Sequence, residues 1–156
     1  MSDRFCMSLN DLLVETFNSI SKVEEKTLKS AGEINLSISE LHLLEAVGKI
    51  GEGGVTISGL AQAMEITLAS VTVAINKLVK KQYVEKVRGT EDGREVYVVL
   101  TRAGTRVNRI HKFFHIQMAR QVCADMSEEE LSVLIKGIER INDYFKQKNA
   151  TMEADS

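Results

Sequence analysis

The chain of 156 residues contains no proline, and this absence favours long, uninterrupted helices. It also lacks a signal peptide and an apolar run long enough to cross a membrane, so we expect a cytoplasmic protein without a membrane partner. The sequence has no Ser/His/Asp grouping, no metal-protease helix and no glycine-rich phosphate cradle. We therefore expect no catalytic residues and no enzymatic activity.

The charge of the chain is unevenly distributed. The net charge of −2 does not by itself suggest a nucleic-acid partner. Residues 67–106, however, contain eight basic and four acidic residues, a net charge of +4, which leaves −6 on the remainder. A locally basic segment on an acidic body is typical of a protein that binds DNA through one module.

Residues 56–81 predict two short helices joined by a tight corner. The first helix spans residues 58–64, and Thr67 is a suitable N-cap for the second, because its hydroxyl can accept a bond from a free backbone N–H. In the second helix the apolar residues recur at three- and four-residue spacing and so share a buried stripe. These residues are Leu68, Val71, Ile75 and Leu78.

The opposite face of the second helix has the chemistry of a DNA-reading surface. Its side chains are small and polar near the N-terminus and basic further along, so the backbone can approach base edges while lysines meet phosphates. The alternative is an ordinary helix pair in a bundle. The residues of this face are Ala69, Ser70, Thr72, Val73, Asn76, Lys77 and Lys80.

A basic hairpin follows. Residues 83–88 and 95–100 have strand character, and the Asp92-Gly93 pair between them is a strong turn signal. Thr101 then caps a new helix. A helix-turn-helix followed directly by such a hairpin is a winged helix, in which Arg88, Asp92 and Arg94 belong to the wing.

This part of the chain resembles the MarR-type winged-helix transcription regulators. The resemblance rests on residues 76–81 at the end of the recognition helix, on residues 83–86, on the Asp92-Gly93-Arg94 motif, and on Leu100-Thr101 and Ala103-Gly104. It implies a mainly α fold with a small β-hairpin wing, formed as an obligate dimer. Gln82 departs from the family, which usually has glycine there to end the helix in a left-handed conformation; glutamine would cost ~1 kcal/mol.

The other helices are also marked by sequence. We predict helices over residues 9–31, 37–50, 102–124 and 127–146, the second and fourth of them starting at the capping boxes Ser37-x-x-Glu40 and Ser127-x-x-Glu130. Residues 1–7 are predicted to form a loose arm.

The first, fifth and sixth helices are too apolar for a thin monomer to bury, so we expect them to pair across a two-fold axis. A homodimer would place two recognition helices ~34 Å apart on double-stranded DNA and predicts a near-palindromic operator. The resulting division is a dimerisation region of residues 1–35 and 102–148, a winged helix-turn-helix DNA-binding region of residues 36–101, and a disordered tail of residues 149–156.

An effector site is implied mainly by resemblance. Residues 17–20, 23–24, 36–42, 45–48 and 72–81 resemble the fatty-acid-synthesis repressors of Gram-positive bacteria, whose corepressor is a long-chain acyl group on acyl carrier protein. The resemblance implies an acyl-chain effector between the first, second and fifth helices, a repressor of fatty-acid synthesis genes, and carrier-protein docking at Lys22, Lys26, Arg109 and Lys112. Core packing is the alternative role for the candidate lining residues, which are Phe17, Ile20, His42, Leu43, Val47, Ile110, Phe113 and Phe114.

The roles of several other residues, and of the winged helix itself, remain open. His111 and His115 have metal-ligand spacing, but without an evident third ligand we expect no metal. Cys6 is a candidate oxidation sensor, although a lone cytosolic cysteine is usually inert, and Cys123 is expected to fill the core or an interface. His42 is expected to be buried. The winged helix could also serve protein interaction rather than DNA binding.

Overall fold

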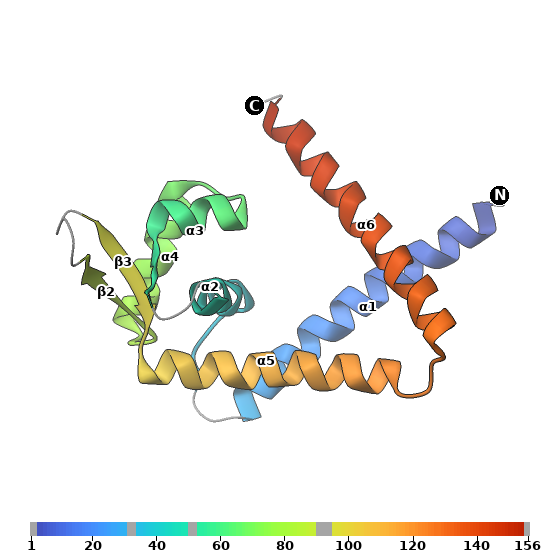
Figure 1. Ribbon diagram of the computed structural model, residues 1–156, viewed down its shortest axis with the longest axis horizontal. Helices are drawn as coiled ribbons and strands as arrows, with labels where there is room; N and C mark the ends of the chain where they lie inside the picture. The colour runs from blue at the N-terminus through green and yellow to red at the C-terminus, as the bar shows by residue number, and fades with distance from the viewer. Residues whose placement is uncertain (1–2, 31–33, 50–52, 90–94, 155–156) are drawn as a thin grey trace. The chain divides into compact units, whose positions relative to one another are not determined.

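The computed structural model describes residues 3–30, 34–49, 53–89 and 95–154. These residues form a mainly helical fold with a small antiparallel sheet, as predicted. They separate into two compact units, residues 1–114 and 115–156, which divide within α5. The elements in chain order (Figure 1) are α1 (Asp3–Ser30), α2 (Ile38–Lys49), β1 (Val55–Thr56), α3 (Ile57–Met64), α4 (Leu68–Lys80), β2 (Val84–Arg88), β3 (Val96–Leu100), α5 (Arg102–Cys123) and α6 (Glu128–Ala154).

The core of the first unit lies between α2, α3, α4 and a sheet of strand order β1-β3-β2. β3 pairs antiparallel with both neighbours, with Val55 opposite Val98 and Val84 opposite Leu100. α2 contributes the largest share of the core because its apolar residues recur at helical spacing. The fully buried side chains are Leu41, Leu43, Leu44, Val47, Leu60, Val71, Ile75, Leu78, Val84 and Val98.

Both predicted capping boxes are confirmed. At the start of α2 the Ser37 N–H donates to Glu40 Oε2 over 2.8 Å, and the Glu40 N–H donates to Ser37 Oγ over 3.2 Å. Ser127 and Glu130 form the same reciprocal pair at the start of α6, at 2.8 and 3.2 Å. Each pair satisfies two backbone donors that the first helical turn leaves without partners.

The ends of the chain are more helical than the sequence pattern predicted. α1 begins at Asp3, so the prediction of a loose arm through residue 7 is wrong. α6 continues to Ala154, past the predicted end at 146 and through most of the expected disordered tail. These segments are polar but contain no glycine or proline, and residues such as Gln, Lys, Ala, Met and Glu let a helix propagate.

The short strand β1 was not predicted from the sequence. Two residues with one apolar side chain are too short a pattern to identify as a strand. β1 matters to the fold because it pairs with β3 and leads directly into α3.

The end of α4 shows how the chain accommodates Gln82. The Gln82 N–H donates to the Val79 carbonyl and the Tyr83 N–H donates to the Leu78 carbonyl, at 2.9 and 3.0 Å, which is a Schellman motif. Gln82 has a φ of 63°, so the left-handed conformation predicted for this position is confirmed. The motif is therefore retained without glycine, at the cost that a Cβ carries in this region.

A half-buried ion pair links the end of α4 to the start of α2. Lys81 Nζ lies 2.9 and 2.8 Å from the two carboxylate oxygens of Glu40. Burial pushes the pKa of Glu40 upward, but the hydrogen bonds from Lys81 and Ser37 outweigh it and hold the pKa below its ordinary value of 4.5. The ionised form of Glu40 therefore stabilises the native state.

We expect Glu40→Gln to lower the free energy of unfolding at pH 7 by ~1–3 kcal/mol, because a charged hydrogen-bonded pair is lost while the cap geometry is kept. Since the pKa of Glu40 is depressed on folding, its stabilisation is present above the unfolded-state value. It is lost as the pH falls through the folded-state value, below 4.5. Urea titrations at pH 7 and at lower pH should show the difference between wild type and variant shrinking with acidity.

The matched control is Glu25→Gln, which removes an exposed pair with Lys29. We expect no measurable change in stability from it. A Glu40→Gln difference that stays constant as the pH falls would contradict this account.

Large apolar side chains remain exposed on both units. On α1 they include Leu9, Leu12, Val14 and Phe17, and Phe17 is 72% exposed. On α6 they include Val133, Ile135, Ile138 and Phe145. Such surfaces on a single chain mark contact sites. Among the residues that the structure describes, no single helix is long and apolar enough to span a membrane; α3 and α4 meet the length and composition criteria only when taken together across a 116° bend.

Candidate nucleic-acid interface

α3 and α4 form the two helices of a helix-turn-helix, with a sharp bend of 116° between them. Side chains and backbone conformation define the corner. Thr56 caps α3 by accepting the Gly59 N–H, and α3 ends at Glu65 in a left-handed conformation with a φ of 53°. Thr67 then caps α4 by accepting the Ser70 N–H over 3.2 Å, as predicted.

The buried face of α4 follows the predicted stripe with one exception. Val71, Ile75 and Leu78 are fully buried. Leu68 is 55% exposed, so its assignment to the stripe is wrong. It lies in the first turn of α4, next to the exposed residues of the corner, where neighbouring elements no longer cover the helix.

The outer face of α4 is accessible along most of its length. Thr72 differs from the prediction, because it is half-buried and its hydroxyl donates to the Leu68 carbonyl within the helix over 2.7 Å. Ser70 shares a 2.8 Å hydroxyl contact with Thr67. The exposed predicted residues are Thr67, Ala69, Ser70, Val73, Asn76, Lys77 and Lys80.

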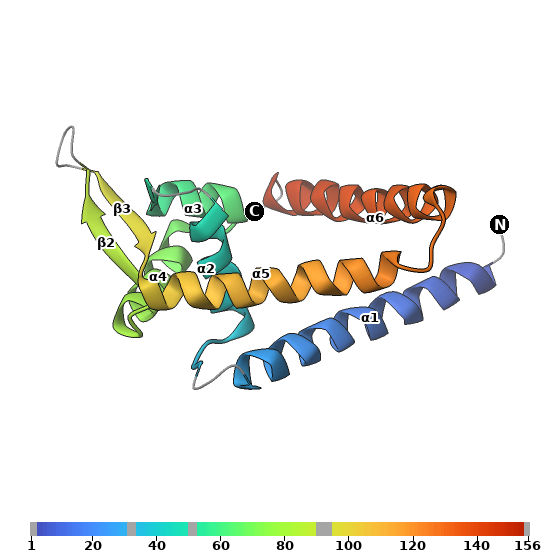
Figure 2. The same cartoon turned by 60° about the horizontal axis from the view of Figure 1, so that its bottom comes forward.

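The β2–β3 hairpin lies beside α4 in both views (Figures 1 and 2). Lys86 on β2 donates to Asn76 Oδ1 over 2.8 Å, so the hairpin and the outer face of α4 form one polar surface. Arg88 is exposed near the end of β2. Lys86 was not among the predicted site residues, because the contact of Lys86 with Asn76 depends on the position of β2 against α4. Asp92 and Arg94 lie outside the described residues.

The start of α5 is tied to the end of α4. Thr101 caps α5 as predicted, since its Oγ1 accepts the Gly104 N–H over 3.1 Å. The same hydroxyl donates to the Gln82 carbonyl over 2.7 Å, and the Thr101 N–H donates to the Tyr83 carbonyl over 3.1 Å. The orientation of α4 is thereby coupled to that of the first turns of α5.

A small helix pair with an exposed polar face beside a basic hairpin is the arrangement of winged-helix DNA-binding proteins. The sequence model of the MarR family matches residues 34–95. The crystal structure of FabT from Streptococcus pneumoniae in complex with DNA is 33% identical in sequence, with a TM-score of 0.82, and the match covers 90% of this chain and 97% of that chain. The chain belongs to the MarR family.

Two further comparisons agree with this MarR-family assignment. The HTH-type transcriptional regulator PchR of Bacillus subtilis (strain 168) is 25% identical over 135 residues, which are 85% of this chain and 75% of PchR. The Staphylococcus aureus MepR–DNA complex has a TM-score of 0.64 at 18% identity over 83% of this chain and 94% of that chain, a likeness of fold alone. The protein is accordingly a MarR-family transcriptional regulator that binds DNA, and the family consists of regulators rather than enzymes.

The predicted effector residues occupy different environments in the MarR fold. Leu43 and Val47 are in the core, whereas Phe17 and Phe113 are 72% and 64% exposed. Ile20, Ile110 and Phe114 are half-buried. His42 is exposed, so its predicted burial is wrong. Helical periodicity places His42 on α2 but does not show that the surrounding elements leave its ring open to solvent.

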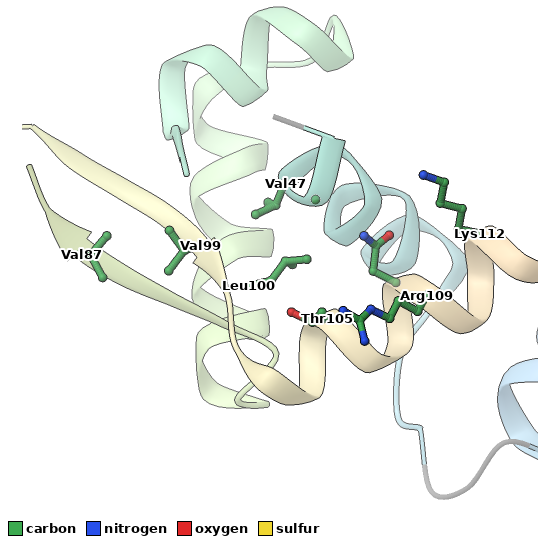
Figure 3. A pocket seen from close by; sticks show the side chains of 9 residues that line it. Val47, Val87, Val99, Leu100, Thr105, Arg109 and Lys112 are labelled. Atoms are coloured by element: carbon green, nitrogen blue, oxygen red, sulfur yellow. The ribbon is translucent and has the colours of Figure 1, made fainter. Parts of the chain in front are cut away.

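A pocket of about 670 Å³ lies between α2, the hairpin and α5 (Figure 3). Of the predicted effector residues it includes Val47. Val87, Val99 and Leu100 add apolar surface, while Asn108, Arg109 and Lys112 supply polar and basic groups from α5. A neighbouring pocket of about 710 Å³ is lined by Ile110 together with Thr105, Arg102, Arg106 and Arg109.

Both cysteines are exposed and have free thiols. Cys6 lies on α1, and Cys123 is the last residue of α5. Cys123 is exposed, so the expectation that it fills the core is wrong, whereas the alternative expectation that it lies in an interface stays a prediction.

Proposed function

We propose that the protein is a homodimeric repressor that binds a near-palindromic operator, acting in the cytoplasm. The observation that carries this proposal is the continuous exposed surface formed by the outer face of α4 and by Lys86 of the hairpin, which contacts Asn76. Ser70 and Asn76 offer hydrogen-bonding groups to base edges, and Lys77 and Lys80 offer charge to phosphates. FabT and MepR, which share the fold, were both crystallised with DNA.

Dimer formation is supported by the apolar side chains left exposed on α1 and α6. Residues such as Leu12 and Phe17 on α1 would be costly to expose on an isolated chain. Native mass spectrometry should give the mass of two chains. Selection of bound sequences from a random duplex library should enrich two inverted half-sites about 10–10.5 base pairs apart, centre to centre. Failure to enrich any sequence would contradict the repressor proposal.

Arg94 is expected to contact phosphate or the minor groove from the wing, held in place by Asp92. Arg94→Ala should weaken binding to all DNA sequences by ~1–3 kcal/mol and reduce the salt slope by about one, because a charged contact is removed. Titration of the selected operator at several salt concentrations measures both quantities. Arg140→Ala, at an exposed position on α6, is the matched control and should change neither.

An Arg94→Ala variant with the wild-type affinity and salt slope would remove Arg94 from the interface. The remaining surface on α4 would then be tested by Lys77→Ala under the same conditions.

The finer part of the proposal is control of fatty-acid synthesis genes, with a long-chain acyl group on acyl carrier protein as corepressor. It is supported by the similarity to FabT and by the resemblance of part of the sequence to the fatty-acid repressors, namely residues 17–20, 23–24, 36–42, 45–48 and 72–81. The pocket of about 670 Å³ adds chemical support, because its size is typical of a ligand site and it combines apolar walls with Arg109 and Lys112. An acidic carrier protein would contact these basic residues at the mouth of the pocket.

The acyl group can change the affinity of the protein for DNA only if it binds the DNA-competent conformation better than other conformations. Long-chain acyl carrier protein should therefore tighten operator binding, whereas the unacylated carrier protein should not. Lys112→Glu should weaken the effect by charge reversal, and Lys136→Glu on α6 is the control. Absence of any acyl effect would contradict the corepressor proposal but leave the DNA-binding proposal standing. Peroxide tests the alternative of an oxidant sensor at Cys6.

A further inference from the structure

A buried histidine joins three helices of the first unit. His111 on α5 is 3% exposed, and its Nε2 lies 3.2 Å from Oε1 of Glu24 on α1, which is itself 4% exposed. Its Nδ1 lies 3.3 Å from Oε2 of Glu45 on α2. The ring of His42, also on α2, has its centroid 5.9 Å from that of His111, with the two planes inclined by 47°.

The spacing of these groups suits a shared metal ion. Two donors that bind one tetrahedral zinc ion at ~2.0–2.1 Å lie about 3.3 Å apart. The 3.2 Å between His111 Nε2 and Glu24 Oε1 matches this edge. Carboxylates and imidazoles are costly to bury. A divalent cation compensates the negative charge of the carboxylate and accepts the lone pairs of the imidazole nitrogens.

We propose that Glu24, His111 and His115 bind one divalent transition-metal ion, because one donor atom from each of the three lies within 4.8 Å of the others. His111 binds the ion through Nε2. Glu45 contacts Nδ1 on the other side of the ring, as carboxylates do in carboxylate–histidine–zinc arrangements. His42 is exposed and so provides a route from solvent. His115 follows His111 by one turn on the same helix. The fourth position is open to water or to His42, whose ring centroid lies 5.9 Å from that of His111. This assignment replaces the expectation of no metal and is independent of the proposed function.

The donor set selects the class of metal. Imidazole nitrogens with one carboxylate favour Zn²⁺ and similar first-row ions, whereas Mg²⁺ and Ca²⁺ prefer oxygen donors throughout. Binding requires neutral imidazoles and an ionised carboxylate, so the affinity falls as the pH is lowered. An ion held by α1 and α5 restrains the two helices together, and because only the folded chain presents the site, it raises the melting temperature.

The test uses the full-length protein, stripped with a chelator and then titrated with Zn²⁺ against a chromophoric competitor. Wild type should bind one ion per chain and melt at a higher temperature with Zn²⁺ than without it. His115→Gln and Glu24→Gln should each lower the affinity at least 10-fold, and Glu45→Gln should lower it 10- to 100-fold, as substitutions of residues that contact a metal-binding histidine do. Glu25→Gln, the exposed neighbour of Glu24, is the matched control and should keep the wild-type affinity.

His115→Gln keeps the measurement informative even if Glu24→Gln fails to fold, because His115 is half-buried and outside the apolar core. Absence of stoichiometric Zn²⁺ binding by wild type overturns the proposal. Equal affinity in wild type and His115→Gln also overturns it. These measurements contain no DNA, so their failure is distinguishable from a failure of operator binding.

Discussion

Ile75→Ala is expected to lower the free energy of unfolding by ~2–5 kcal/mol. Ile75 is fully buried at the centre of the α4 stripe, between Val71 and Leu78, where α4 packs on the rest of the core. Truncation removes buried methyl and methylene groups and leaves a cavity that a close-packed core fills only in part. Denaturant titration measures the change, which should appear in the transition midpoint with the slope retained.

Asn76→Ala is the matched control, one position along the same helix. Asn76 is exposed, and its contact with Lys86 is also exposed, so we expect a much smaller loss of stability. In operator binding the order of the two effects should be reversed, because Asn76 is one of the residues proposed to contact DNA. If Asn76→Ala destabilises the protein more than Ile75→Ala, the assignment of the two faces of α4 is wrong.

These two faces were predictable because helical periodicity is a local property of the sequence. Three buried positions of α4, both capping boxes and the Thr67 and Thr101 caps follow from spacing and hydrogen-bonding chemistry within a few residues. Leu68 shows the limit of the method. Periodicity gives the direction in which a side chain points, but not how far along the helix its neighbours extend.

The effector residues show the same limit over longer distances. Phe17 and Phe113 lie on apolar faces that the sequence identifies, yet both are exposed in the structure. An apolar stripe does not state which helix covers it, or whether a second chain does so. The contact of Lys86 with Asn76 was likewise not predictable, because it joins a strand and a helix whose relative placement depends on the core between them.

The group around His111 combines both kinds of information. The i, i+4 spacing of His111 and His115 was visible in the sequence, but Glu24 is 87 residues away and could not be assigned from a local pattern. Only packing of α1 against the α5 histidine brings that carboxylate to 3.2 Å. When the donors of a site come from elements that are distant in sequence, they can be identified only once the fold is known.

Gly104→Ala is expected to destabilise the protein by ~3 kcal/mol or more. A Cβ at this position would meet the Tyr83 carbonyl oxygen at 1.9 Å, and backbone atoms cannot yield as the end of a flexible side chain can. Displacing that carbonyl would also disturb its 3.1 Å hydrogen bond from the Thr101 N–H, which ties α5 to the end of α4. For a chain of this size the melting temperature should fall by roughly 2–4 °C per kcal/mol.

Gly137→Ala in α6 provides the contrast. A Cβ there meets no atom within 4 Å, so the substitution should be neutral or stabilising by up to ~1 kcal/mol through helix propensity. Near-UV circular dichroism of both variants separates local repacking from loss of the fold. Because the Tyr83 N–H donates to the Leu78 carbonyl at the end of α4, any Gly104→Ala protein that remains folded should also bind the operator more weakly. Wild-type stability in Gly104→Ala would contradict the close approach of α5 to Tyr83 on which this coupling depends.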